Sequence, residues 1–129
     1  MNAISSSPLV QWQQFCRKEK LAFQRDRHGQ AVFYPRVVSP HTGHGDLTWH
    51  VSIGQGTVYS VTILYSKGMV TGNVALIELD ERFRMLSTVR VDSLQLPEIG
   101  MRVQVCFEPA QDPEGAPVPV FIPMAARGA

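Results

Sequence analysis

The feature that most constrains the fold is a dense series of short apolar segments between Trp49 and Pro123, each separated from the next by turn residues. The most regular one spans residues 101–107, where apolar side chains occupy alternate positions. This period of two is typical of a half-buried strand. The predicted strands are residues 59–65, 74–79, 84–91, 101–107 and 118–122. Five strands within roughly 75 residues fit a small closed barrel of the OB type, which leaves no long sheet edge exposed.

Turn residues mark the expected boundaries between these strands. They are Lys67-Gly68, Thr71-Gly72-Asn73, residues 97–100 and the loop 109–117. Glycine, proline and asparagine are frequent in tight turns because they adopt or preset the required backbone angles. The pattern predicts a mainly β protein.

A short amphipathic helix is predicted upstream, from Ser7 to about Lys20. Ser7 suits an N-cap and Pro8 suits the first helical position, and the apolar side chains that follow recur at helical spacing. Two short strands, 21–24 and 31–36, then surround a turn at 26–29, and a second turn follows at 39–43. Such a ribbon makes little core of its own. The expected organisation is a tail and helix (1–20), a ribbon (21–48), a barrel (49–124) and a flexible tail (125–129).

Amino-acid composition narrows the classes of function that this chain can have. The chain has twelve Lys and Arg residues and eleven Asp and Glu residues, so its net charge is +1. This balance provides no strong field to attract a polyanion. No apolar run approaches the ~20 residues of a membrane span, so a soluble, cytoplasmic protein is expected. The two cysteines, Cys16 and Cys106, are interpreted as reduced structural thiols.

Four segments, in order, resemble the family called domain of unknown function 35. GQGTVYSVT at 54–62 is similar to its G-x-G-x-V-Y-S-x-T signature, and VALIELDE at 74–81 to its second signature. IGMRVQV at 99–105, followed by Phe107-Glu108, resembles the third, and PVFIP at 119–123 resembles the closing strand. The resemblance covers about residues 8–123. Arg82 stands where the family usually has a glycine after the second signature.

The resemblance implies a rubredoxin-like zinc ribbon followed by an OB fold, and a role in acyl-CoA metabolism. Family members typically partner thiolase-like enzymes or enoyl-CoA hydratases of the hot-dog type. The resemblance therefore implies a non-catalytic accessory protein with one of these enzymes as its partner and acyl-CoA as a further ligand. No nucleic-acid or membrane partner is expected.

The family's zinc ligands are missing from this sequence. The family carries C-x-x-C twice, and four thiolates complete a tetrahedral zinc site. Alignment places these positions at Arg25, His28, Ser39 and Thr42. We therefore expect no zinc and no other cofactor. A rearranged metal site made of Asp26, His28, His41 and His44 stays open as the alternative, because imidazole and carboxylate groups are competent zinc ligands.

The remaining candidates concern binding. Trp12, Phe15 and Tyr34 are interface candidates, although each also suits a core. Arg25, Arg27 and Arg36 are candidates for contacts with CoA phosphates, against the interpretation that they are solvated charges. The adjacent carboxylates Glu78, Asp80 and Glu81 are interpreted as a strand end, and no catalytic motif is present. The alternative function is single-stranded nucleic-acid binding, with Tyr59, Tyr65 and Phe83 stacking on bases.

Overall fold

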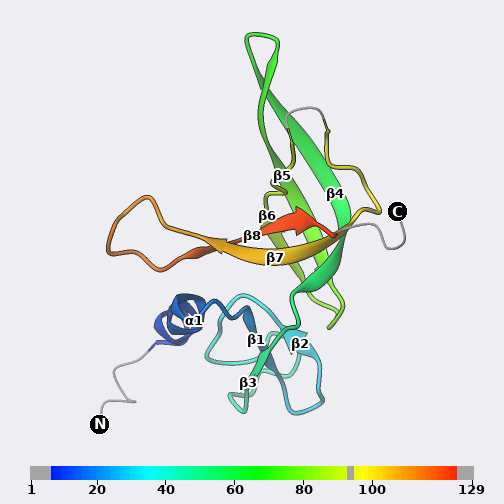
Figure 1. Cartoon of the computed structure of the whole chain (residues 1–129). Helices are drawn as coiled ribbons and strands as arrows, with labels where there is room; N and C mark the ends of the chain where they lie inside the picture. The colour runs from blue at the N-terminus through cyan, green and yellow to red at the C-terminus, as the bar shows by residue number, and fades with distance from the viewer. Residues whose placement is uncertain (1–6, 93–94, 125–129) are drawn as a thin grey trace. The chain divides into compact units, whose positions relative to one another are not determined.

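The computed structural model describes residues 7–92 and 95–124, which form one α-helix and eight β-strands (Figure 1). The chain divides into two compact units. The first contains the described residues up to Ile53 together with Phe107–Val118, and the second contains Gly54–Cys106 and the described residues from Pro119 onward. The mainly β class with an N-terminal helix is confirmed. No helix in the described part of the chain has both the length and the apolar character needed to cross a membrane.

Helix α1 (Pro8–Arg17) begins where the sequence predicts. The Ser7 side chain accepts a hydrogen bond from the backbone N–H of Val10 at 3.2 Å, so Ser7 is the N-cap. The helix ends at Arg17, before the expected Lys20, because Lys18 is the C-cap and Glu19 adopts a φ of +58°. The indole N–H of Trp12 in α1 donates to the backbone oxygen of Ala22 at 2.9 Å, which ties the helix to the strand that follows.

A three-stranded antiparallel sheet, in the order β2–β1–β3, completes this part of the first unit. Its strands are β1 (Ala22–Arg25), β2 (Ala31–Val32) and β3 (Thr48–Val51). The strand predicted over residues 31–36 stops at Val32, because the Gln24 side chain engages the backbone of Arg36. The Gln24 amide donates to the Arg36 oxygen at 3.1 Å, and its carbonyl accepts from the Arg36 N–H at 2.9 Å. Trp49, the expected start of the barrel, lies in β3 opposite Gln24.

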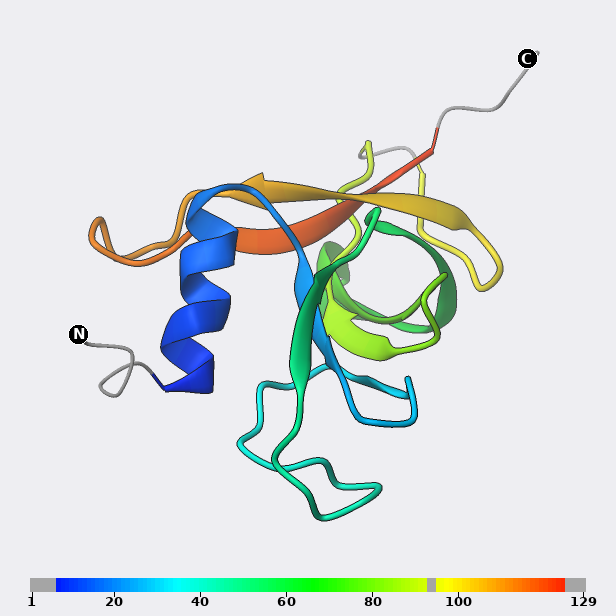
Figure 2. The same cartoon turned by 90° about the horizontal axis from the view of Figure 1, so that it is seen from below.

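The second unit holds most of a five-stranded sheet in the order β6–β5–β4–β7–β8. The strands are β4 (Gln55–Ser66), β5 (Met69–Leu79), β6 (Arg84–Ser87), β7 (Arg102–Glu108) and β8 (Val118–Pro123). The segment after β6 closes the sheet onto β8, where Val89 forms a parallel bridge with Phe121 and the Arg90 N–H donates to the Phe121 oxygen at 2.8 Å. This closure explains why β6 ends at Ser87, before the predicted end at Val91. Figure 2 shows the curled β4 and β5 nearly end-on, as a ring.

The hairpin of β4 and β5 extends well beyond the rest of this sheet (Figure 1). Lys67 and Gly68 alone connect its strands, with φ values of +54° and +78°. Positive φ at both central residues is the signature of a type I′ turn, which matches the twist of the strands. The predicted turn at Thr71-Gly72-Asn73 is wrong. These residues lie within β5, where a shift in register between Leu64 and Tyr65 accommodates them.

The buried side chains of the second unit come from most of its strands. They include Val58, Ala75, Ile77, Leu79, Phe83, Met85, Val89, Val103, Val120 and Phe121. Asn73 supports the closure from inside, since its side chain donates to the Val89 oxygen and accepts from the Val89 N–H, each at 2.9 Å. A half-buried polar side chain with hydrogen-bond partners of this kind can be accommodated next to an apolar core.

Candidate functional site

Asp26 and Ser39 form the centre of the ribbon in the first unit. The Asp26 Oδ1 accepts hydrogen bonds from the backbone N–H groups of His28 at 2.9 Å and Gln30 at 3.0 Å. The Ser39 hydroxyl donates to Asp26 Oδ2 at 3.2 Å and accepts from the N–H groups of His41 and Thr42, at 3.0 and 3.4 Å. Both side chains are buried.

The ionisation of Asp26 reflects this environment. Burial is the largest single influence and by itself raises the pKa of the carboxyl group. The hydrogen bonds from Gln30, His28 and Ser39, together with the nearby His41, act in the opposite direction and hold the pKa of Asp26 below its ordinary value. Asp26 is therefore a carboxylate at neutral pH, with its oxygens directed at donors within the ribbon.

The four residues of the alternative metal site do not form a metal site in the structure. Among residues 7–92 and 95–124, no three His, Cys, Asp or Glu side chains are arranged to hold a metal ion. His28, His41 and His44 are exposed. The backbone of His44 is engaged instead, since its N–H donates to the Thr42 hydroxyl at 3.1 Å and its oxygen accepts from the Ser39 N–H at 2.8 Å.

Two of the three candidate arginines already have partners. The Arg25 guanidinium donates to the Gly29 oxygen at 2.9 Å and lies 4.9 Å from the centre of the Phe23 ring. Arg27 forms an exposed ion pair with Asp46 at 3.1 Å. Arg36 is exposed, and Gln24 holds its backbone in place. The ribbon thus presents Arg36 and the exchangeable Arg27 to solvent.

The helix aromatics lie partly inside the first unit. Trp12 packs edge-on against Phe33, with ring centres 6.0 Å apart, and Phe15 packs against Trp49 at 5.3 Å. Both side chains are half-buried, whereas Tyr34 is exposed. Of the three interface candidates, Tyr34 therefore has the most accessible side chain.

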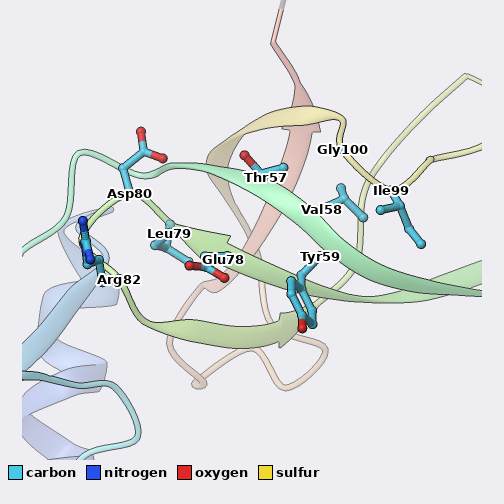
Figure 3. A pocket seen from close by; sticks show the side chains of 9 residues that line it. All are labelled: Thr57, Val58, Tyr59, Glu78, Leu79, Asp80, Arg82, Ile99 and Gly100. Carbon is cyan, nitrogen blue, oxygen red and sulfur yellow. The ribbon is translucent and has the colours of Figure 1, made fainter.

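A hollow of about 590 Å³ lies on the second unit and is lined from β4, β5, the turn after β5, and residues 99–100 (Figure 3). Two carboxylates at its wall are ion-paired. Glu78 accepts from Arg84 at 2.9 Å, and Asp80 accepts from both terminal nitrogens of Arg102 at 2.8 Å. The hydrogen bonds from Arg102 lower the pKa of Asp80. A carboxylate held ionised in this way is a poor general acid.

The aromatic side chains proposed to stack on nucleic-acid bases do not form one platform. Phe83 is buried in the core. The Arg84 guanidinium covers the Tyr59 ring, with its central carbon 3.7 Å from the ring centre, and Tyr65 is exposed near the hairpin turn. Base-stacking proteins present accessible rings along a positive groove, and this arrangement does not favour that function.

The outer surface of the hairpin carries an apolar face that sequence reasoning missed. Because residues directly opposite in an antiparallel pair share a face, the pairs Leu76–Leu86, Ser60–Leu76 and Thr62–Val74 lie on one side. We call the exposed residues Leu64, Val74 and Leu86 the apolar outer face. Their exposed fractions are 42%, 43% and 60%. The expected turn at residues 71–73 hid this face, since it divided the hairpin at the wrong place.

Comparison with known proteins points to the same family as the sequence motifs. Residues 49–108 match the family model of the C-terminal OB-fold domain of ChsH2. The chain is also similar to a chain of the solved structure described as "Ltp2-ChsH2(DUF35) aldolase", with 26% identity, a TM-score of 0.75, and coverage of 95% of this chain and 98% of that chain. The chain therefore resembles DUF35 proteins over 95% of its length. The resemblance drawn from the four sequence motifs and the expected OB fold are thus confirmed.

A second solved structure shares the fold of this protein. It is a DUF35-family protein of unknown function from Sulfolobus solfataricus, with 14% identity and a TM-score of 0.63 over 81% of each chain. No curated protein matches the sequence.

Proposed function

We propose that this protein is a non-catalytic accessory subunit of acyl-CoA metabolism that binds a thiolase-like enzyme, with an enoyl-CoA hydratase-like enzyme as the alternative partner. The similarity to a chain of the Ltp2-ChsH2(DUF35) aldolase supports this, because it extends over nearly the full length of both chains. The paired states of Glu78 and Asp80 are consistent with a binding role, since neither carboxylate is poised to transfer a proton.

The apolar outer face is the observation that carries the proposal. Leu64, Val74 and Leu86 are exposed on adjoining strands, and Ser60, Thr62 and the half-buried Leu76 lie beside them on the same side. Exposed apolar side chains that share one face with polar neighbours are typical of a protein–protein contact site. The nearest charged pair on this side, Arg84 with Glu78, lies at one end of the apolar outer face, next to Leu86 and Leu76. We propose that the partner enzyme docks here.

The experiment has two steps. First, the tagged full-length chain is purified from its host, and the co-purifying thiolase-like or hydratase-like enzyme is identified by mass spectrometry. Second, the two purified proteins are titrated by calorimetry. A variant with Leu64→Thr, Val74→Thr and Leu86→Thr keeps β-forming residues on the strands. We expect it to lose roughly 100-fold in affinity, as hot-spot truncations do.

The matched control changes two exposed apolar residues of the first unit, Leu9→Gln and Val10→Gln. We expect this variant to bind the partner within about threefold of the wild type, a range typical of near-neutral contacts. If a folded outer-face variant binds as well as the wild type, the docking surface is wrong. If the chain turns over acyl-CoA substrates alone, or binds single-stranded DNA with submicromolar affinity in physiological salt, the proposed function is wrong.

We further propose that the ribbon arginines contact the phosphates of CoA. The Arg27 pair with Asp46 is exposed on both sides, and such pairs contribute little to stability. A phosphate can therefore replace Asp46, with Arg36 as a second donor and Arg25 held nearby by Gly29. The calorimetric titration, repeated with CoA on the wild type and on Arg27→Gln/Arg36→Gln, tests this. Equal affinity of the two proteins for CoA contradicts it.

A further inference from the structure

The two turns of the ribbon are built alike. In the Asp26 turn, the Asp26 N–H donates to the Gln30 oxygen at 3.0 Å, and the Gly29 N–H donates to the Asp26 oxygen at 2.9 Å. In the Ser39 turn, the Ser39 N–H donates to the His44 oxygen and the Gly43 N–H donates to the Ser39 oxygen, both at 2.8 Å. In each turn the side chain of the first residue then accepts two backbone N–H groups from the residues that follow.

This geometry forms two adjoining cradles of backbone donors. Cradles of successive N–H groups stabilise negative charge, and many iron–sulfur sites use them. Here the first cradle holds an ionised carboxylate oxygen and the second holds a hydroxyl oxygen. The Ser39 hydroxyl proton bridges the two cradles, since it is donated to Asp26 Oδ2 at 3.2 Å.

The residues of this ribbon do not fit the zinc ion that the family implies. The Arg25 guanidinium carries no lone pair for a metal and is bonded to Gly29. Ser39 uses its hydroxyl proton and its oxygen within the cradles. Among the residues that the structure describes, no three metal-ligating side chains converge.

We infer that the Asp26–Ser39 hydrogen bond takes the structural place of the metal, joining the two turns so that the ribbon folds without an ion. The bond is buried, so water competes for it poorly, and each partner is oriented by two backbone donors. The two turns then form one cooperative unit. The formation of this unit does not depend on the proposed partner enzyme.

The test is hydrogen exchange of the full-length protein, followed amide by amide by NMR, on Ser39→Ala. If the two side chains join the turns, exchange accelerates by about tenfold or more at His41 and Thr42 and also across the bond at His28 and Gln30. Asp26→Asn, a milder change, provides the reciprocal readout at His41 and Thr42 if Ser39→Ala fails to fold. Prolonged dialysis of the wild type against EDTA should leave its melting temperature unchanged.

Two substitutions serve as controls. Ser60→Ala removes an exposed hydroxyl from the second unit, and Asp46→Asn removes an exposed carboxylate from the ribbon. Neither should alter exchange at the four amides. Acceleration confined to the turn that carries the substitution means that the turns are independent and overturns the inference. A lower melting temperature after EDTA treatment shows that a metal is required and overturns it equally.

Discussion

Replacing Gly56 with alanine tests the register of the barrel directly. Gly56 is buried in β4 between Leu79 of β5 and Val103 of β7. A Cβ atom at Gly56 would lie 2.5 Å from the backbone oxygen of Glu78 and 3.1 Å from the Ile77 Cγ2 atom. Since a Cβ atom essentially never lies within 3.0 Å of such a neighbour, the backbone of β4 or β5 must shift by at least 0.5 Å, the difference between 3.0 and 2.5 Å.

The size of the destabilisation by Gly56→Ala depends on which neighbouring atoms can move. The atom in the way belongs to the backbone, and pairing with β7 on the other side prevents β4 from shifting freely. We therefore expect a loss near the upper end of the range for overpacked sites, about 3 kcal/mol. Urea unfolding should show a midpoint lower by roughly 1–3 M, given slopes of about 1–3 kcal/mol/M for small proteins. Far-UV circular dichroism is the suitable probe, because Trp12 and Trp49 both lie in the first unit.

Two other glycines of the hairpin separate the contribution of steric overlap from that of backbone strain. At Gly72 a Cβ would meet nothing within 4 Å and φ is ordinary, so Gly72→Ala should change stability by less than about 0.5 kcal/mol. Gly68 also has open space but a φ of +78°, so Gly68→Ala should cost about 1–2 kcal/mol from backbone strain alone. If Gly56→Ala proves no worse than Gly72→Ala, the close approach of β4 to Glu78 is wrong.

Two further predictions concern single residues. Arg82 has a φ of +74° at the position where the family usually has glycine. Arg82→Gly should therefore raise the free energy of unfolding by about 0.5–1 kcal/mol, whereas Arg82→Lys should leave it unchanged. Equal stability of the glycine and lysine variants would refute this prediction. Burial raises the pKa of the Cys16 thiol to about 11, which leaves little reactive thiolate at pH 8. Iodoacetamide labelling followed by mass spectrometry should therefore modify Cys16 in the native protein far more slowly than in urea, and similar rates under both conditions would show that the thiol is accessible.

Local features of the sequence were sufficient for much of this architecture. The helix start could be predicted from Ser7 and Pro8, because capping depends on residues only three positions apart. The strand around Val103 could be predicted because apolar and polar residues alternate in the sequence, although in the structure only Val103 of β7 is buried and residues 104–108 are half-buried. The four motifs pointed to the family and its OB fold, which the comparisons confirm.

Long-range pairing decided the rest. Trp49 lies in the first sheet because β3 pairs with β1, a partner more than twenty residues earlier that no local pattern specifies. The turn at Lys67-Gly68 could be predicted from the sequence, but only the pairing of β4, β5 and β6 placed residues 71–73 within β5 and brought Leu64, Val74 and Leu86 to one outer face. The Asp26–Ser39 bond likewise joins residues thirteen positions apart. A pattern along the chain shows which side chains prefer burial, but their partners are determined only when distant strands and turns are brought together in the folded chain.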